Sequence, residues 1–364
     1  MSFKPTIPRH TQSLLRNIRP SKVNRRHAAV KAGARPPTEV RGMARDVAAV
    51  VVTYRPAAST FRNLRLLASQ IRTVYVIDNT PKSAARHLFQ QIRSIRGVRL
   101  VRLGLNTGIG AALNLGMELA RIEGFNWVIT LDQDSTLPNG AAKRLRRGVI
   151  SDEVGLVASQ IRDAFSNRLI LRKADSLIHQ KREVVITSGN LVRIEAWMDV
   201  GGFDWRFFLD SVDFDFCLRL AKAGWQVRRS EDVTLMHRLG RPRKIKCLGF
   251  RLTVRSYPPF RRYFQARNGV TVVRRHVVFA PLWSLEHSIR LLLVWLKIVL
   301  VERKSRLSWT KGLIAGLENR DSGIKPLPIK GMRRNSTLRT QERAIQKTAL
   351  RYRQRMAESS DYVP

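Results

Sequence analysis

Short apolar runs rich in β-branched residues alternate with stretches of helical periodicity along the first third of the chain. Val47 to Tyr54, Thr73 to Asp78 and Val98 to Val101 have the composition of buried strands. Apolar residues recur at helical spacing after each run, and the third leads into a predicted helix over residues 108–123. Because strands joined through helices need crossover connections, the alternation predicts an α/β fold with a mostly parallel sheet and helices on both faces.

A fourth apolar run, Trp127 to Leu131, ends in two carboxylates, Asp132 and Asp134. Ligands bind beyond the carboxyl ends of the strands in open α/β sheets, so these acids are predicted to face a bound molecule. Two hard oxygen ligands suit a divalent cation, and a cation suits a diphosphate. Asp and Ser are also common in turns, so a polar loop after a strand is the alternative interpretation.

Small residues fill the segment from Asn106 to Gly116, where the third strand gives way to its helix. Small residues and exposed amides at a helix start let an anion approach, but the same residues also allow a helix to pack tightly on a sheet. The glycine spacing differs from G-x-G-x-x-G and follows the third strand, which excludes a nicotinamide or flavin fingerprint.

A second acidic cluster follows Phe207. Asp210 and Asp213 are three residues apart and are predicted to share a helix face, whereas Asp215 is predicted to pair with Arg219 four residues later. A carboxylate at a helix start can accept a proton from a hydroxyl nucleophile. Acidic residues are also common in a first helical turn for electrostatic reasons, so capping is an equal alternative for Asp210.

His237 follows a predicted strand over residues 233–236, and a separate short strand is predicted over residues 225–227. An imidazole at the end of a strand could complete a metal site with Asp132 and Asp134. The rest of the chain is predicted to be helical and basic, with helices starting near Pro258 and Pro281.

The helix from Pro281 carries an uncharged apolar run, Leu291 to Leu296, that is much too short to cross a bilayer, which takes about 20 residues. It is predicted to be either a membrane-surface helix or a packed core helix, and the neighbouring basic tail favours the first.

The formal net charge of +40 implies a polyanionic neighbour. Basic residues are dense in residues 1–45 and again from Lys325 onward, without the interleaved aromatic side chains typical of a base-stacking surface. Anionic lipid therefore fits better than nucleic acid, at about 1 kcal/mol per basic residue close to the membrane. The two cysteines, Cys217 and Cys247, support neither a disulfide framework nor a zinc finger, which favours a reducing cytosol.

Taken in order, these motifs resemble those of family 2 glycosyltransferases with the GT-A fold, in particular bacterial rhamnosyltransferases and, more distantly, galactofuranosyltransferases. The resemblance covers roughly residues 47–320 and lies in the series VVTYRP, VIDN, LNTGIGAALNLG, ITLDQDS, TSGN, GGFDWRFFLDSVDFDFCLR, LMHRLG and RRYFQARNG. One departure stands at Thr80-Pro81, where the family usually continues with Gly-Ser.

The resemblance implies a nucleotide-diphosphate-sugar donor, with dTDP-rhamnose favoured, inversion in a single displacement, and Mn²⁺ or Mg²⁺ as the cation. Asp213 matches the catalytic base, and Asp210, Arg267 and Asn268 are expected at the acceptor. The residues expected at the nucleotide are Thr53, Asp78, Asn106 and Asp132. Those expected at the metal are Asp132, Asp134 and His237.

The expected division of the chain is a basic arm over residues 1–45, a catalytic domain over 46–240, a helical region over 241–320 and a basic tail over 321–364. The expected acceptor is a lipid-linked glycan in surface polysaccharide synthesis, such as O-antigen, on the inner face of the cell membrane. The alternatives are another hexosyltransferase of the same fold, an inactive protein that keeps the fold, and, less favoured, a basic nucleic-acid-binding protein.

Overall fold

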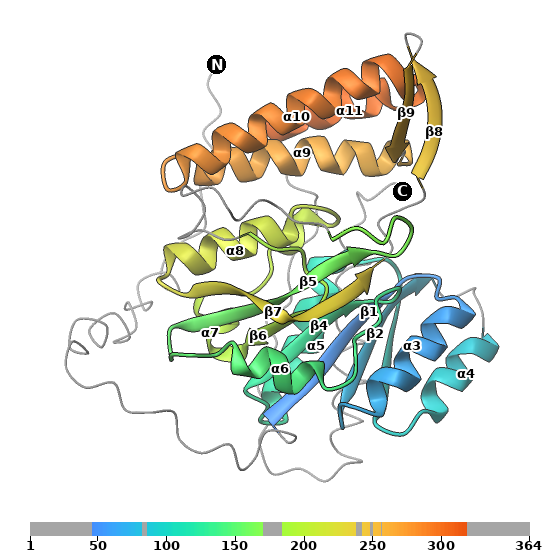
Figure 1. The fold of residues 1–364 in the computed structure, drawn as a ribbon, viewed down its shortest axis with the longest axis vertical. Coiled ribbons are helices and arrows are strands. Elements are labelled where there is room, and N and C mark those ends of the chain that lie inside the picture. Colours follow the sequence, from blue (N-terminus) through green and yellow to red (C-terminus); the bar gives the residue numbers. More distant parts are fainter. Residues whose placement is uncertain are drawn as a thin grey trace, which may run out of the picture. The chain divides into compact units, whose positions relative to one another are not determined.

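A seven-stranded sheet forms the centre of the computed structural model, which describes residues 46–81, 86–169, 184–237, 242–247, 250–255 and 257–318 (Figure 1). The strand order is β3-β2-β1-β4-β6-β5-β7. The strands are β1 (Val47–Thr53), β2 (Val74–Pro81), β3 (Val98–Gly104), β4 (Trp127–Asp132), β5 (Val154–Asp163), β6 (Asn190–Arg193) and β7 (Gln226–His237). The predicted arm over residues 1–45 and tail over 321–364 lie outside the described residues.

All strands of this sheet except β6 run in the same direction. β1 is parallel to β2 and β4, β2 is parallel to β3, and β5 is parallel to β7, whereas β6 is antiparallel to both of its neighbours. The predicted mixed α/β fold with a mostly parallel sheet is therefore confirmed. β6 was not predicted, because its four residues are too few to show a period.

Helices cover both faces of the sheet, as the alternating side chains of β1 show. Val47, Ala49 and Val51 pack in one core cluster with residues of α3, α4 and α6, while Ala48 and Val50 join a second cluster with residues of α5, α7 and α8. The helices are α3 (Ala58–Ala68), α4 (Arg86–Ser94), α5 (Ile109–Ile122), α6 (Ala141–Arg147), α7 (Ile194–Asp199) and α8 (Val212–Lys222).

The small residues of α5 serve close packing. A Cβ atom added at Gly116 would lie 2.4 Å from Cγ1 of Val50, and one at Gly110 would lie 3.0 Å from the carbonyl oxygen of Asp204. The backbone N–H of Ile109 already donates to the carbonyl of Phe208, at 2.8 Å. The packing interpretation of this segment is therefore the one that the structure supports.

Two predictions for the second half of the chain were wrong. The two short strands expected near residues 225–236 are one strand, β7, whose pairing with β5 shifts register between Ala158 and Gln160. An antiparallel hairpin of β8 (Pro242–Cys247) and β9 (Phe250–Arg255) stands where only helix was expected. The hairpin has a visible signal, because Phe, Leu and Val alternate with polar residues along β9.

The C-terminal helices begin near the predicted prolines. They are α9 (Pro259–His276), α10 (Pro281–Val301) and α11 (Arg306–Leu317). Val272, Ala280 and Trp283 belong to the core cluster that also contains residues of α5 and α8, so these helices share a core with the α/β layers. Within the described parts of the chain, no helix combines the length and apolarity needed to cross a bilayer.

Buried ion pairs connect α8 to α9. The carboxylate of Asp215 is 2.7 Å from Nε of Arg219, as predicted, and 3.1 Å from Nε2 of His276. Asp204 lies 2.8 Å from Arg206 and 2.5 Å from Arg275. Burial alone would raise the pKa of Asp204, but the hydrogen bonds from the two arginines outweigh it and hold the pKa at about 2. Hydrogen bonds to His276 and Arg219 likewise outweigh burial and lower the pKa of Asp215.

We expect these carboxylates to make the protein sensitive to acid. A carboxyl group whose pKa is lower in the folded state stabilises the fold above its ordinary pKa of 3.8, and this stabilisation is lost as the pH falls towards about 2. At pH 7, Asp215→Asn should lower the free energy of unfolding by roughly 3 kcal/mol, because it leaves buried cations unpaired. The difference from the wild type should shrink as the pH falls below 4.

Urea unfolding between pH 7 and pH 3, followed by circular dichroism, measures both effects. The matched control is Asp152→Asn, which removes an exposed carboxylate 3.9 Å from Arg193 and should change stability by less than about 1 kcal/mol. A constant difference between wild type and Asp215→Asn across this range would contradict the assignment.

Candidate active site at the carboxyl edge of the sheet

The strand register brings the candidate polar residues to one edge of the sheet. Thr53 is paired with Asp78 across β1 and β2, and Val52 is paired with Asp132 across β1 and β4. His237 ends β7, which is parallel to β5. Because these strands run in the same direction, their carboxyl ends open towards the same side.

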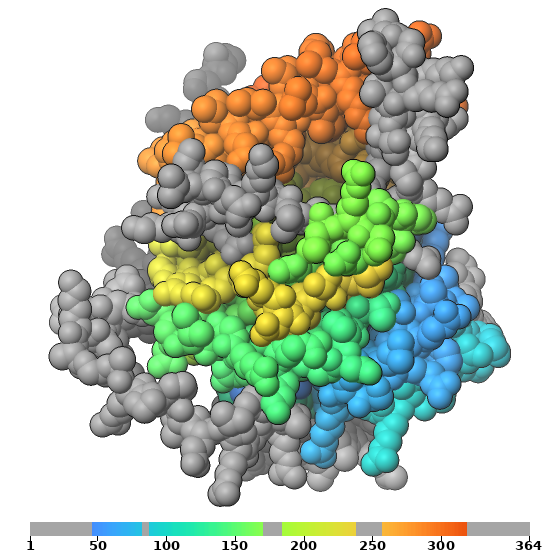
Figure 2. Space-filling view, viewed as in Figure 1, coloured from blue at the N-terminus to red at the C-terminus, as the bar shows by residue number. Residues whose placement is uncertain are grey.

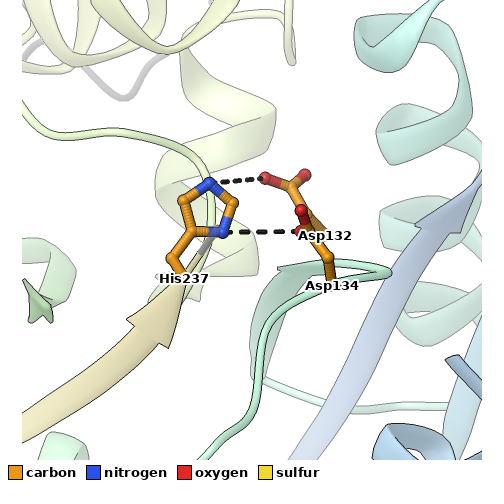
Figure 3. A group of neighbouring side chains, drawn as sticks. All are labelled: Asp132, Asp134 and His237. Carbon is orange, nitrogen blue, oxygen red and sulfur yellow. Dashed lines mark ion pairs between the residues drawn. The ribbon is translucent and has the colours of Figure 1, made fainter. Parts of the chain in front are cut away.

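Asp132, Asp134 and His237 lie together at this edge, as predicted (Figure 3). Nε2 of His237 is 3.9 Å from a carboxylate oxygen of Asp132, and Nδ1 is 3.5 Å from one of Asp134. One ligand atom from each residue lies within 4.8 Å of the others. Ligands on opposite sides of one Mg²⁺ ion are about 4.2 Å apart, so small side-chain movements would let the three bind a single cation.

Two serines orient this cluster. The hydroxyl of Ser135 lies 2.9 Å from Nδ1 of His237 and 2.7 Å from the hydroxyl of Ser188, which accepts the backbone N–H of Asp132 at 3.0 Å. With the ring proton on Nδ1 and donated to Ser135, the lone pair of Nε2 faces Asp132 and can bind a metal. Sequence reasoning did not assign either serine, although both lie in the motifs ITLDQDS and TSGN.

The electrostatics of Asp132 favour a cation nearby. Burial raises the pKa of its carboxyl group, and the Asp134 carboxylate acts in the same direction, whereas His237 and Arg261 act against them. Placing two carboxylates together is unfavourable when both are charged. A divalent cation between them would remove this repulsion, which makes the donor set fit a hard metal ion such as Mn²⁺ or Mg²⁺.

Thr53 and Asp78 also meet, but they bond to each other. The fully buried carboxylate of Asp78 accepts from the hydroxyls of Thr53, at 2.9 Å, and Thr80, at 2.7 Å, and lies 3.4 Å from Nε of Arg102. Thr80, at the first position of the turn where the family usually continues with Gly-Ser, thus has a structural role. The side chain of Asn106 caps its own loop by accepting the N–H of Gly108 at 3.1 Å. Nucleotide binding by Thr53, Asp78 and Asn106 stays a prediction.

Asp213 lies in the first turn of α8 and is half-buried, with Oδ1 accepting the N–H of Phe214 at 3.0 Å. Asp210 does not share its helix face, contrary to prediction, because α8 begins only at Val212 and Asp210 has a φ of 61°. Its carboxylate instead forms two bonds with Arg261 of α9, at 3.0 and 2.8 Å. The capping alternative is also wrong for this residue, since Asp210 precedes Ser211, the N-cap of α8, and lies outside the first helical turn.

The loop before α8 has a strained backbone. Phe208, Asp210 and Ser211 all have positive φ angles, between 46° and 62°. Such conformations cost of order 1–3 kcal/mol each in residues other than glycine and persist only where the surroundings hold them. No glycine in this loop signals the turn, so the sequence offered no sign of the strain.

Arg267 and Asn268 of α9 hold this loop. Nδ2 of Asn268 lies 2.6, 2.6 and 3.0 Å from the carbonyl oxygens of Phe207, Leu209 and Asp210, which share its two N–H donors, and Arg267 donates to the carbonyl of Arg206. Their polar groups are thus used within the protein, and contact with an acceptor stays a prediction.

Arg261 is a further residue of this site that sequence reasoning missed. It reaches from α9 to Asp210, and its charge also acts on Asp132. Only its place in the motif RRYFQARNG, six and seven residues upstream of the predicted acceptor pair, pointed to it.

Comparison with known proteins gives family matches along most of the described chain. The model of "Glycosyl transferase family 2" matches residues 49–203, and that of "Glycosyl transferase family group 2" matches residues 127–314, more than half of the 364-residue chain. The dTDP-rhamnosyl transferase RfbF of Shigella flexneri is 26% identical over 283 residues, which are 73% of this chain and 92% of that protein.

Two solved structures also match part of the chain. TarS 1-349 of S. aureus, in complex with UDP-GlcNAc, matches with a TM-score of 0.48 and 13% identity, over 86% of this chain and 91% of that one. GalNAc-T7 with UDP, GalNAc and Mn²⁺ matches with a TM-score of 0.46 and 14% identity, over 63% of this chain and 47% of that one.

The family matches agree with the motif order and with the arrangement of the sheet. A mostly parallel seven-stranded sheet, with paired acids where β4 ends, is the GT-A type of architecture that the resemblance implied. Family membership sets aside the interpretation as a nucleic-acid-binding protein. The chain belongs to the family 2 glycosyltransferases and is similar to their rhamnosyltransferase members.

Proposed function

We propose that the protein is an inverting hexosyltransferase that moves rhamnose from a nucleoside-diphosphate donor to a hydroxyl group of a glycan. The cluster of Asp132, Asp134 and His237 is the observation that carries this proposal. Two carboxylates and one imidazole nitrogen would hold Mn²⁺ or Mg²⁺, which would stabilise the negative charge that develops on the departing nucleoside diphosphate.

The donor is proposed to be dTDP-rhamnose. Support comes from the similarity to a dTDP-rhamnosyl transferase over 92% of that protein's length. No motif in the chain encodes the sugar itself, so a galactofuranosyl or other hexosyl donor is the alternative. The nucleotide would lie over the carboxyl ends of β1, β2 and β4, beside Thr53, Asp78 and Asn106.

Asp213 is proposed to be the general base. Its carboxylate would take the proton of the acceptor hydroxyl while that oxygen attacks the anomeric carbon and the bond to the diphosphate breaks. A single displacement inverts the anomeric centre and needs no enzyme nucleophile, so one carboxylate at the reacting carbon is sufficient. The rigid loop before α8, held by Arg261 and Asn268, would fix the position of this carboxylate.

The acceptor is proposed to be a lipid-linked glycan used in surface polysaccharide synthesis, with the enzyme on the inner face of the cell membrane. The net charge of +40 supports attraction to anionic lipid. Arg267 and Asn268 would affect the acceptor chiefly through the loop that they hold, and Asp210 through its bond to Arg261.

The role of Asp213 can be tested with Asp213→Asn, which keeps the shape of the side chain but cannot accept the proton. We expect kcat to fall by about 10²–10⁴-fold while donor affinity stays within about twofold. Transfer of radiolabelled sugar measures kcat, and calorimetry measures donor binding. Asp199→Asn, in an acid hydrogen-bonded to Trp225, is the control and should keep full activity. Unchanged kcat in Asp213→Asn would remove this residue from the mechanism.

The metal site can be tested without turnover. Asp134→Asn and His237→Asn should each weaken Mn²⁺ binding by about tenfold or more, because each removes one of three protein ligands. Titration followed by the electron paramagnetic resonance of free Mn²⁺ measures the affinity. His87→Asn, in an exposed histidine of α4, is the control. Wild-type Mn²⁺ affinity in both site variants, or full activity in excess chelator, would overturn the proposed site.

The donor can be identified by thermal shift, since a ligand that binds only the folded protein raises its Tm. Among dTDP-, UDP- and GDP-sugars with Mn²⁺, we expect dTDP-rhamnose to give the largest shift, and we expect the shift to shrink when Mn²⁺ is omitted. A larger shift with another donor would replace rhamnose in the proposal while leaving the family assignment intact.

A further inference from the structure

The outward face of α10 is apolar along the whole helix. Its exposed large side chains recur at intervals of three and four residues, the spacing of one helix face. Leu285 is 60% exposed and Leu293 is 59% exposed, and Val278, in the turn before the helix, is 94% exposed. The members of this outward stripe are Leu282, Leu285, Ile289, Leu292, Leu293, Leu296 and Leu300.

The opposite face of α10 already has its packing partners. Trp283 is buried in the main core cluster, and Ile298 is buried in a cluster with Ala266 of α9 and Trp309 of α11. The outward stripe is therefore a second apolar face and is not needed to attach the helix to the protein. A helix at a protein–water boundary normally presents polar residues outward, so a stripe of this length indicates a contact surface.

Positive charge lies next to the stripe. Arg303, Lys304, Arg306 and Lys311 are all exposed in the segment that follows the C-terminal end of α10. The nearby acids are paired: Glu302 is buried against Arg262 and Lys297, and Glu286 lies 2.8 Å from Arg290. Figure 2 shows part of the surface of these C-terminal helices in orange.

An apolar stripe beside a basic segment favours a lipid surface over a second copy of the chain as the partner. A symmetric dimer through the stripe would bring together two copies of a protein with a net charge of +40, which repel each other. Anionic headgroups would instead neutralise the same side chains while the leucines enter the acyl boundary. The exposed Trp295 on this helix is a residue type enriched at membrane interfaces.

We propose that α10 lies parallel to the surface of an anionic bilayer, with its outward leucine stripe among the lipid chains and the basic segment at residues 303–311 against the headgroups. This deepens the proposed function, since it rests on the membrane location proposed above and names the surface that makes the contact. It gives the exposed stripe a partner without requiring a helix that crosses the membrane.

Flotation of the full-length protein with vesicles tests the contact. Vesicles of phosphatidylcholine with 30% phosphatidylglycerol are compared with vesicles of phosphatidylcholine alone. We expect the wild type to bind the anionic vesicles at least tenfold more tightly. Leu285→Glu combined with Leu292→Glu should reduce binding by at least tenfold, and Lys304→Glu combined with Lys311→Glu should reduce the preference for anionic lipid severalfold, because other basic residues remain. Leu66→Glu, in an exposed leucine of α3, is the matched control and should bind as the wild type does.

Light scattering and circular dichroism of the same variants complete the test. All four substituted residues are exposed, so the variants should keep the wild-type spectrum. If the leucine variant binds vesicles as tightly as the wild type, the proposal is overturned. If it instead converts a wild-type dimer to a monomer, the face belongs to a second copy. Vesicle binding needs no donor or turnover, so it can fail while sugar transfer is intact, and the reverse also holds.

Discussion

The site depends on the parallel direction of β4 and β7. β4 delivers Asp132 and Asp134 to the carboxyl edge of the sheet, and β7 delivers His237 to the same edge from more than 100 residues further along the chain. β6 lies between β4 and β5 and is antiparallel to both, so β4 and β5 still run in the same direction. If β7 ran the other way, the imidazole would lie at the opposite edge, and the acids would lack their third partner.

The first part of the fold could be predicted because its signals are local and repeated. Three of the first four strands, β1, β2 and β4, contain a continuous apolar run, and Thr53, Asp78 and Asp132 stand at the ends of these runs. The direction of parallel strands then determines where their ends meet, which is why Asp132, Asp134 and His237 could be grouped before any distance was known.

The remaining features depend on contacts between distant residues. The left-handed backbone at Phe208, Asp210 and Ser211 is held by side chains of α9, about 60 residues later, and none of the three is a glycine. Arg261 was missed for the same reason, since its partner Asp210 is 51 residues away. The hairpin β8–β9 does not depend on distant contacts. Apolar and polar residues alternate along β9, so a strand could have been predicted there, but the basic composition of the region led to a prediction of helix.

The contacts of Asn268 with the carbonyls of Phe207, Leu209 and Asp210 tie the C-terminal helical region to the loop before α8. A shortened chain that stopped after the sheet would keep the residues of the metal cluster, yet it would release the turn that leads into α8. Val212 of α8, Val272 of α9 and Trp283 of α10 lie in one core cluster, so the helix that we propose to contact lipid and the turn that leads to Asp213, the proposed base, belong to a single packed unit.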